Sequence, residues 1–517
     1  MPKSTTPTEL KKSISLKEKV GQLFMPAVFI NDTEQEIREM EELIAQYYVG
    51  GLCFFHSRAS AATNFESKKE VIYNADSYET LKTLINRYQN VSKYPLLIAI
   101  DAEWGLAMRV ENTPQYPYAI TMGAMQNATE LLFEVGKNIA NNCKTAGIHW
   151  NLAPCVDLNN NPNNPVIGYR SFGENKELVT EKASAFIKGT QSEGVLTSIK
   201  HFPGHGDTAT DSHLGLPLIE KSETELVKNE LYPFQKLIDE GVDSVMVGHL
   251  SVPSLANGKR ISSSISKEII KGVLRKEMGF DGVVISDALN MHAVAKNYPT
   301  PGELEWLAFD AGNDVLCFAE HTKEGIDTIL SKASKHQIEE SFERIWKLKA
   351  KAFKIEKLNS KRIPSSELNI KIAAQSLTLF SGTEEVIASF RNTDYCTLTL
   401  KRWGNQTEEE ILKDLKTIAK EVSDEENILL LLTPPQVKPN SNFGFLPEEI
   451  DFINQLISEK KVVLYHYGNP YALRLFKTDK TLATVIVYQD FKEFQEVATA
   501  HFMGKLKANG KLPVKLK

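Results

Sequence analysis

The sequence contains few cysteines, and their placement excludes a disulfide-stabilised fold. Only five occur among 517 residues, an odd number with no Cys-x-x-Cys spacing between any two of them. Several lie in apolar stretches such as GLCFF and NDVLCF, which is typical of reduced thiols in a protein interior. We therefore expect free thiols at Cys53, Cys143, Cys155, Cys317 and Cys396.

Long hydrophobic runs are also missing. No uninterrupted apolar run is long enough to span a bilayer. Residues 1–20 contain no apolar segment of the kind that a secretory signal requires. We expect a cytoplasmic protein without a membrane span; an exported protein or lipoprotein whose leader had been removed would show the same N-terminal sequence.

An excess of positive charge is absent as well. Lys and Arg number 60 against 66 Asp and Glu, which gives a net charge of −6, and no basic cluster is interleaved with aromatic residues. Proteins that bind nucleic acid need such a cationic surface, so we expect no nucleic-acid partner. The hydrophobic share of 42% and the charged share of 24% are typical of a globular protein with a buried core.

Short apolar segments alternate with amphipathic ones through the first two thirds of the chain. The apolar segments are rich in Val, Ile, Leu and Phe, as strands buried on both faces are. Residues 174–194 and 221–241 have helical patterns, and Ser222 with Glu225 can form a capping box. Eight repeats of strand and helix predict a TIM-like (β/α)₈ barrel over residues 1–354. The eight expected strands are 21–29, 49–55, 94–101, 148–157, 195–202, 242–249, 281–287 and 313–319.

The pattern changes at residues 355–368, a polar stretch with a proline that we interpret as a linker. Beyond it, residues 369–517 show the same alternation on a smaller scale. This predicts a second, αβα-sandwich domain, in which helices cover a parallel sheet. The expected strands are 394–401, 427–434, 460–468 and 481–489, and the expected helices are 407–422 and 447–460.

Polar residues follow the expected strands of the first domain where each strand ends. The carboxyl ends of parallel barrel strands meet at one mouth, where barrel enzymes place their functional groups. Residues far apart in the sequence are therefore expected to converge there: Asp101, Glu103, Arg109, Asp157, Lys200, His201, His249 and Asp287.

Asp287 follows the apolar run VVIS and one interpretation makes it structural. Asp is a favoured N-cap, and a helix is expected to begin near Leu289. The alternative is that its half-buried charge is used in chemistry, because an unused buried carboxylate is costly. Its place at the barrel mouth favours the functional interpretation.

Residues 200–217, KHFPGHGDTATDSHLGLP, concentrate titratable groups in a Gly- and Pro-containing stretch. An acid–base site would use His213, which titrates near neutral pH, with Asp211 fixing its tautomer. A polar loop without a role is a further interpretation. A metal site is also open, although no HExxH helix is present; its ligands would be His201, His205, Asp207, Asp211 and His213.

The motif KHFPGHG, followed by DSH and LP, together with SDAL.M at the seventh strand, resembles the family-3 glycoside hydrolases. More narrowly, it resembles their β-N-acetylglucosaminidase (β-N-acetylhexosaminidase) branch, which carries Asp-x-His on the loop after strand five. SLKEKVGQLFM, IDAEWGLAMRV, NLAPCVDLN and YRSFGEN also have family counterparts, so that the resemblance covers roughly residues 15–350. The C-terminal part, ending in GKLPV, resembles the αβα domain of two-domain members.

The resemblance implies roles for individual residues and no metal or cofactor. Asp287 matches the catalytic nucleophile, and Asp211 with His213 matches the acid–base dyad. The family's D-x-E-G-G-R segment differs here, because Trp104 and Leu106 replace a glycine and an arginine, which leaves the sugar specificity open. The matching sugar-binding positions are Asp101, Arg109, Arg170, Lys200 and His201.

The implied activity is that of a retaining exo-β-N-acetylglucosaminidase acting on cell-wall (muropeptide) or chitin-type oligosaccharides. The expected partner is a small oligosaccharide, and the sequence predicts no oligomeric state. Another β-glycosidase specificity remains open. So does a glycoside phosphorylase, because an imidazole acid–base does not repel phosphate. A non-catalytic carbohydrate-binding protein is the alternative outside the enzymes.

Overall fold

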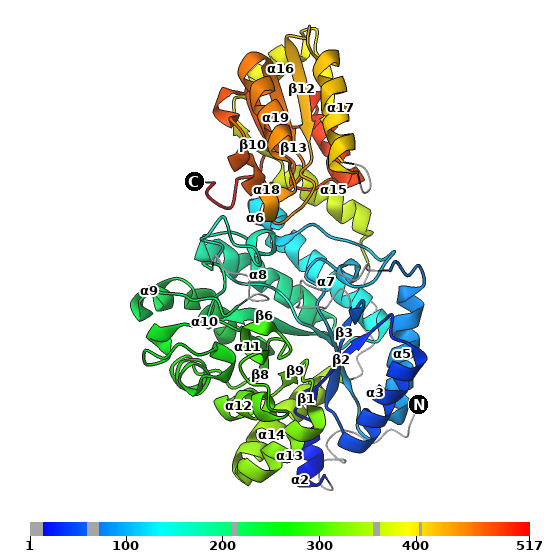
Figure 1. Cartoon of the computed structure of the whole chain (residues 1–517), viewed down its shortest axis with the longest axis vertical. Helices are drawn as coiled ribbons and strands as arrows, with labels where there is room; N and C mark the ends of the chain where they lie inside the picture. The colour runs from blue at the N-terminus through cyan, green and yellow to red at the C-terminus, as the bar shows by residue number, and fades with distance from the viewer. Residues whose placement is uncertain (1–13, 59–71, 209–214, 355–361, 403–405, 517) are drawn as a thin grey trace. The chain divides into compact units, whose positions relative to one another are not determined.

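The computed structural model describes residues 14–58, 72–208, 215–354, 362–402 and 406–516 (Figure 1). The chain forms two compact units. Unit 1 comprises Met1–Tyr116, Leu132–Leu158 and Val179–Arg362, and unit 2 comprises Pro117–Leu131, Asn159–Leu178 and Ile363–Lys517. The predicted limits at residues 354 and 369 do not anticipate that two segments from the first part of the chain belong to unit 2.

Unit 1 contains a parallel sheet whose strands follow the chain order from β2 to β8. A separate parallel pair joins β1 (Phe24–Met25) to β9 (Leu316–Cys317), and Pro26 separates β1 from β2. A parallel bridge links Ile285 of β8 to Val315, directly before β9. The strand order therefore closes on itself, and all eight predicted barrel strands are confirmed. The seven sheet strands are β2 (Ala27–Phe29), β3 (Gly51–Phe55), β4 (Leu97–Ile100), β5 (Trp150–Asn151), β6 (Leu196–Phe202), β7 (Ser244–Val247) and β8 (Val283–Ser286).

The strands are buried because helices cover the outer face of the barrel while apolar side chains fill its interior. Every residue of β4, β6, β7 and β8 is buried. The predicted helix 174–194 is α8 (Lys176–Ser192), and the predicted helix 221–241 is divided into α9 (Glu223–Lys228) and α10 (Leu231–Asp239). The capping box between Ser222 and Glu225 is present. Other helices of the barrel are α3 (Glu34–Tyr47), α5 (Ser77–Val91), α7 (Thr129–Ala146), α12 (Glu303–Ala311), α13 (Thr322–Lys332) and α14 (Lys335–Ala352).

Unit 2 is built on a five-stranded sheet of order β10-β14-β13-β12-β11. The four strands expected from the sequence are present and parallel, but β10 is an additional, antiparallel edge strand, so the prediction of a purely parallel sheet is wrong at this edge. β10 is short and partly exposed, and it lacks the apolar run by which the other strands are recognised. The strands are β10 (Thr378–Ser381), β11 (Cys396–Leu400), β12 (Asn427–Leu432), β13 (Lys461–His466) and β14 (Ala483–Ile486).

Two groups of helices pack with this sheet. α17 (Glu408–Glu421) contacts α19 (Pro447–Glu459), and these are the two predicted helices. α15 (Ser365–Ser376) and α16 (Glu384–Arg391) contact α20 (Lys492–Phe502). The ring of Tyr465 on β13 packs edge-on against Phe502 of α20. Unit 2 thus has the layered α/β architecture expected for the second domain.

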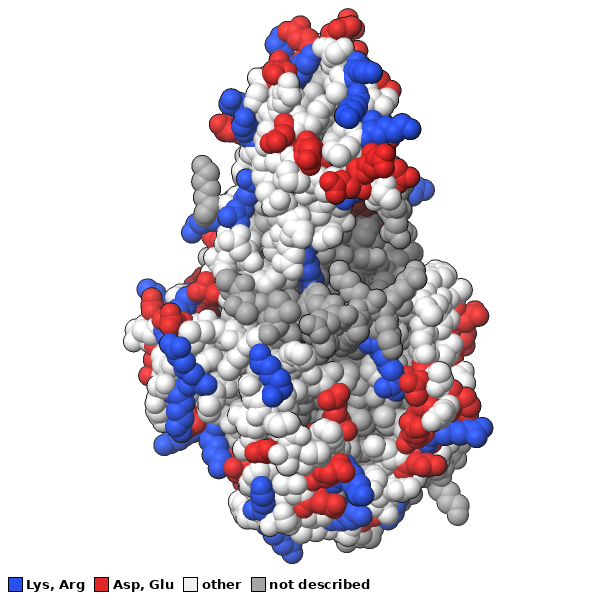
Figure 2. All heavy atoms as spheres, viewed as in Figure 1, with Lys and Arg blue, Asp and Glu red and all other residues white. Residues whose placement is uncertain are grey.

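The charge distribution and the hydrophobicity of the helices bear on which partners the protein can have. On the face shown in Figure 2, Lys and Arg side chains occur among Asp and Glu side chains on both units, in keeping with the small net charge of −6. Among the helices that the structure describes, none combines the length and the apolar character needed to cross a bilayer.

Candidate active site

The first cluster of the candidate site joins β4 to β6. Asp101 follows β4, and its two carboxylate oxygens lie 2.7 Å from Nζ of Lys200 and 2.9 Å from Nη2 of Arg109. Nζ of Lys200 also lies 2.8 Å from Oε1 of Glu103. The Lys200 side chain is only 2% exposed. Two carboxylates and two cations therefore form one compact network at the carboxyl ends of neighbouring strands.

The turn between Asp101 and Arg109 depends on Gly105. Its φ of +101° is unfavourable for residues with a Cβ, and an added Cβ would lie 2.7 Å from the carbonyl oxygen of Pro114. The turn brings the Arg109 guanidinium back to Asp101 and places it 4.7 Å from the ring centroid of Phe55. This stacking and the ion pair together fix the direction of Arg109.

The charge state of Asp101 results from opposing effects. Burial raises the pKa of this carboxyl, but the positive charges of Lys200 and Arg109 outweigh it and hold the pKa at about 2. Asp101 is therefore a carboxylate at neutral pH. Such a group accepts hydrogen bonds and is suited to adjacent sugar hydroxyls.

A second cluster is organised around Asp157, which is fully buried. Its carboxylate accepts hydrogen bonds from Nδ1 of His201 at 2.8 Å, from the His201 backbone N–H at 3.1 Å and from the His205 backbone N–H at 2.7 Å. Burial raises its pKa, yet the His201 and His205 interactions prevail and hold it at about 2. Asp157 thus anchors the start of the loop after β6 and orients the His201 ring, because a donating Nδ1 fixes the tautomer.

Asp287 lies immediately after β8 and is partly exposed. Its Oδ1 accepts from the Ala288 N–H at 2.8 Å, and its own N–H donates to the Val247 carbonyl of β7 at 2.9 Å. Burial raises the pKa of this carboxyl, but His201 and His249 nearby, the Ala288 N–H and Lys200 lower it overall. Asp287 is therefore ionised at neutral pH, as a nucleophile must be.

The interpretation of Asp287 as a helix cap is wrong. The helix that follows, α11, spans His292–Ala295 and has Met291 as its N-cap. The expected start near Leu289 fails because the chain makes a turn after Asp287 before the helix begins. The carboxylate is therefore not used to cap a helix, which leaves it available for chemistry.

His249, two residues after β7, supports the backbone beside Asp287. Its Nε2 lies 2.9 Å from the Ala288 carbonyl oxygen, and its Nδ1 lies 2.8 Å from Oγ of Ser264. A carbonyl only accepts, so Nε2 carries a proton and donates to Ala288, while the serine hydroxyl can donate to or accept from Nδ1. His249 is 1% exposed and acts on Asp287 through the adjoining peptide.

Two of the predicted catalytic residues, Asp211 and His213, lie outside the described residues, so their placement stays a prediction. The described chain on each side of them is anchored to unit 1. Before them, Nδ1 of His205 lies 2.8 Å from Oγ1 of Thr208. After them, the Pro217 carbonyl accepts from the Ser251 N–H at 2.8 Å.

Arg170 belongs to unit 2, in contrast to the other predicted sugar-binding residues. It ends the short 3-10 turn Gly168–Arg170, and its Nη1 donates to the Val166 carbonyl at 3.3 Å. The structure thus brings Asp101, Arg109, Lys200, His201 and Asp287 together in unit 1 and places Arg170 on a loop built into unit 2.

The described residues of 200–217 do not share a common centre, as the ligands of the alternative metal site would. Of its described members, His201 bonds Asp157, His205 bonds Thr208, and Asp207 forms an ion pair with Lys221 at 2.8 Å. These three side chains therefore have separate partners.

One other group of potential ligands occurs among the described residues: Cys155, Asp157 and His201. Oδ2 of Asp157 lies 3.1 Å from Sγ of Cys155 and 2.8 Å from Nδ1 of His201. These are hydrogen-bond separations, whereas ligands about 2.0–2.3 Å from a tetrahedral zinc lie farther from one another. The arrangement fits a hydrogen-bonded scaffold.

The sequence did not single out the thiols beside the site. Cys53 of β3 and Cys317 of β9 pair with the same broken strand, at Ala27 and Met25 respectively, and both are buried. The hydrogen bond between Cys317 and Cys53, burial and the charges of Asp101 and Asp287 raise the pKa of Cys317 well above its ordinary value. The expected burial of these two thiols is confirmed. Side chains along a strand alternate between its two faces, and this alternation is the sequence signal that would have placed Cys53 and Cys317 at the site.

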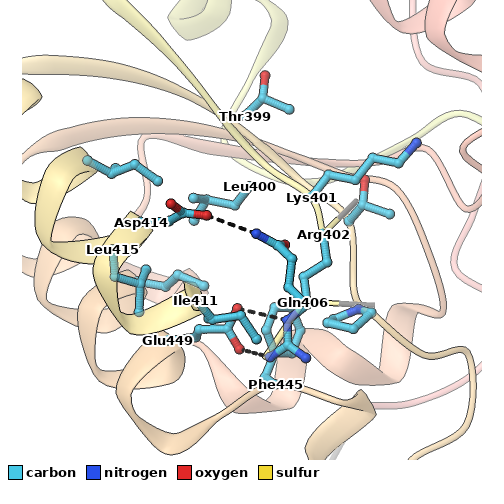
Figure 3. Close-up of a pocket in the computed structure, with 14 residues that line it drawn as sticks. Thr399, Leu400, Lys401, Arg402, Gln406, Ile411, Asp414, Leu415, Phe445 and Glu449 are labelled. Atoms are coloured by element: carbon cyan, nitrogen blue, oxygen red, sulfur yellow. Dashed lines mark hydrogen bonds and ion pairs between the residues drawn. The ribbon is translucent and has the colours of Figure 1, made fainter. Parts of the chain in front are cut away.

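A cavity of about 110 Å³ lies in unit 2 between α17, α19 and the carboxyl ends of β11 and β12 (Figure 3). Its walls are largely apolar, and its charged side chains have ion-pair or hydrogen-bond partners. Arg402 forms an ion pair with Glu449, and Nε2 of Gln406 donates to Oδ2 of Asp414 at 2.9 Å. Of the predicted catalytic and sugar-binding residues that the structure describes, none lines this cavity.

A closed parallel barrel with ionised carboxylates and cations at the carboxyl ends of its strands defines the class: a barrel enzyme equipped for polar substrates such as sugars. The comparison with known families identifies it further. Residues 15–348 match the glycosyl hydrolase family 3 N-terminal domain, and the chain belongs to this family.

Individual relatives agree with this assignment. The chain is 31% identical to beta-hexosaminidase A of Pseudoalteromonas piscicida over 371 residues. This match covers 66% of this chain and 58% of that protein. It is 34% identical over 283 residues to a beta-hexosaminidase of Tolumonas auensis, covering 54% and 78% respectively. A family 3 beta-N-acetylglucosaminidase from Paenibacillus sp. FPU-7 superimposes with a TM-score of 0.78 at 26% identity, over 98% of this chain and 99% of that one.

Proposed function

We propose that the protein is a retaining exo-β-N-acetylglucosaminidase that removes terminal β-linked N-acetylglucosamine. The observation that carries the proposal is the ionised Asp287 at the end of β8, whose pKa is lowered by His201, His249 and Lys200. The similarity to beta-hexosaminidases and to a beta-N-acetylglucosaminidase supports the choice of sugar.

Asp287 attacks the anomeric carbon and forms a covalent glycosyl-enzyme, while the bond to the leaving oxygen breaks. His213 donates its proton to that oxygen. It then takes a proton from water as the water attacks the same carbon and releases Asp287. Retaining enzymes commonly use a second carboxyl group for this task. An imidazole does it near neutral pH without a large pKa shift, and Asp211 stabilises the imidazolium.

The sugar hydroxyls bind to the ionised network of unit 1. Asp101 accepts from hydroxyl groups, and Lys200 and Arg109 donate. The existing ion pairs hold these groups in position before substrate arrives, which reduces the loss of side-chain entropy on binding. Trp104, in place of a family glycine, offers an indole surface beside this network and is proposed to tune the specificity.

The natural substrate is proposed to be a cell-wall fragment, with a chitin-type oligosaccharide as the alternative. A cytoplasmic location, which is itself a proposal, favours a role in peptidoglycan recycling. Product analysis with a muropeptide and with chitobiose as competing substrates separates the two. Release of N-acetylglucosamine 1-phosphate when phosphate is added would instead identify a phosphorylase.

The direct experiment compares Asp287→Asn with Asp281→Asn, an exposed aspartate just before β8. On p-nitrophenyl β-N-acetylglucosaminide, Asp287→Asn is expected to abolish turnover with unchanged folding, and Asp281→Asn to retain it. Turnover by Asp287→Asn at the wild-type rate contradicts the proposal. Binding of the sugar by the wild type without turnover identifies a non-catalytic carbohydrate-binding protein.

His213→Ala separates the roles further. It is expected to reduce hydrolysis of substrates with poor leaving groups far more than hydrolysis of the p-nitrophenyl substrate, because p-nitrophenolate leaves without protonation. Equal losses on both substrates contradict the assignment of His213 as the acid.

A further inference from the structure

The loop that carries Arg170 is part of unit 2, although it follows a barrel strand in the sequence. We refer to residues 159–174 as the Arg170 loop. Its ends are tied together, because the Asn159 N–H donates to the Gly173 carbonyl at 3.0 Å. The Asn159 carboxamide holds the loop on both sides: its oxygen accepts from the Gly168 N–H at 3.1 Å, and its nitrogen donates to the Tyr471 hydroxyl at 2.7 Å. The turn that ends in Arg170 is thereby fixed at Gly168.

The other side of the Arg170 loop is bound by residues 510–515, which we call the C-terminal strap. The Glu174 N–H donates to the Pro513 carbonyl at 3.2 Å. In return, the Glu174 carboxylate accepts from the Lys515 backbone N–H at 2.9 Å and lies 3.3 Å from Lys515 Nζ. The reciprocal bonds between Glu174 and residues 513–515 join segments that are more than 300 residues apart in the chain.

The contact between the strap and the loop is closely packed. Gly173 has a φ of +147°, and a Cβ on it would lie 2.6 Å from the Pro513 carbonyl oxygen. A Cβ on Gly123, in α6 (Ala119–Ala124), would lie 1.9 Å from the Phe172 carbonyl oxygen and 3.2 Å from Cβ of Pro513. Backbones that approach this closely leave little room for the loop to shift.

The strap itself is anchored to unit 2 before it reaches the loop. The Gly510 N–H donates to the Leu377 carbonyl, and the Lys511 N–H donates to the Ala124 carbonyl, both at 2.9 Å. Val514 is 4% exposed. The strap therefore transmits the fixed position of the sheet and of α6 to the Arg170 loop.

We propose that the C-terminal strap is a positioning element for substrate binding, which holds Arg170 in the orientation that its sugar contact requires. This inference rests on the proposed function together with the sugar-binding role that the family resemblance predicts for Arg170. Glu174 and Pro513 act through the loop and make no contact with substrate. Removing either side chain leaves Arg170 present but poorly oriented. We therefore expect kcat/KM to fall about as much as it would if Arg170 lost its own hydrogen bond to the sugar.

The test uses the full chain with Glu174→Ala, the conservative Glu174→Gln and the control Glu177→Ala. Glu177 is a neighbouring carboxylate whose side chain is 58% exposed, and its nearest ionic partner is Lys176 at 3.9 Å. Glu174→Ala is expected to lower kcat/KM for the p-nitrophenyl substrate by roughly tenfold to a hundredfold, the range for a lost hydrogen bond to a charged group. Glu174→Gln is expected to restore most of the loss, and Glu177→Ala to match the wild type.

Two further readouts separate positioning from folding. Amide hydrogen exchange at Val166, Ile167 and Gly168, whose N–H groups are bonded within the loop, is expected to accelerate in Glu174→Ala while the thermal midpoint is unchanged. The double variant Arg170→Ala/Glu174→Ala is expected to be no worse than Arg170→Ala alone, because both act on one interaction.

Unchanged exchange in the Arg170 loop, or additive losses in the double variant, would overturn the role of the strap. If Arg170→Ala alone retains wild-type kcat/KM, the sugar-binding role of Arg170 within the proposed function is wrong. The exchange measurement still decides in that case whether the strap holds the loop.

Discussion

The most informative substitution outside the reacting groups is Asp157→Asn. The carboxylate accepts from two backbone N–H groups and from Nδ1 of His201. An amide has one accepting oxygen and a nitrogen that donates. The new amide nitrogen would therefore face N–H donors that the carboxylate now accepts from. The side chain is only 1% exposed, so water cannot relieve this conflict. Each buried hydrogen-bonding group left unsatisfied costs about 1–3 kcal/mol.

The pKa of Asp157 gives an independent magnitude. It is about 2 in the folded protein against an ordinary value of 3.8. A difference of nearly two pH units at 1.36 kcal/mol each corresponds to about 2 kcal/mol of stability. Because the folded pKa is the lower one, this contribution is fully present above pH 4, falls by about half near pH 3, and is lost as the pH falls through 2. We therefore expect Asp157→Asn to lose about 2–4 kcal/mol at pH 7.

The assay is urea-induced unfolding at pH 7 and at pH 3, monitored by circular dichroism, with Asp281→Asn as the exposed control. The difference between Asp157→Asn and the wild type is expected to shrink at pH 3, and kcat/KM at pH 7 to fall as His201 loses its orientation. A variant within about 0.5 kcal/mol of the wild type at pH 7, the range of neutral surface substitutions, would refute the reasoning.

Two further predictions concern buried lysines. Burial of Lys349 lowers its pKa from 10.5 to about 7. Between pH 7 and 9 the unfolded chain therefore keeps a proton on this lysine that the folded chain has lost. The free energy of unfolding of the wild type should rise over this range by up to about 3 kcal/mol relative to Lys349→Met. Urea titrations at both pH values, with the exposed Lys347→Met as control, check this, and parallel pH profiles would contradict it. Lys200→Met removes the cation that lowers the pKa of Asp101 most. It should reduce kcat/KM by roughly tenfold to a hundredfold and move the acid limb of its pH profile upward; an unchanged limb argues against Asp101 as a required carboxylate.

Much of the barrel was accessible from sequence because its strands are continuous apolar runs. The bounds of the individual strands were predicted less exactly from the local pattern. The expected strand 148–157 is reduced to Trp150–Asn151, since Pro154 has no N–H for a strand ladder. β10 was missed because Thr378–Ser381 is short and partly exposed. The membership of the Arg170 loop in unit 2 depends on contacts with residues 510–515, which no local pattern records.

The candidate site was accessible in part. Strand ends gave Asp101, Lys200, His201 and Asp287, which the structure gathers in unit 1. The sequence did not show that Asp157 anchors the loop after β6, nor that Cys53 and Cys317 lie beside the site, because both depend on pairing across the barrel. The positions of Asp211 and His213 lie outside the described residues and stay a prediction.

Trapping the covalent intermediate tests the central claim most directly. A 5-fluoro derivative of N-acetylglucosaminyl fluoride slows the second step, so that the sugar remains on the nucleophile. Peptide mapping by mass spectrometry is expected to find one sugar on the peptide that contains Asp287 and none after Asp287→Asn. An adduct on Glu103, or inhibition without any adduct, would contradict the account.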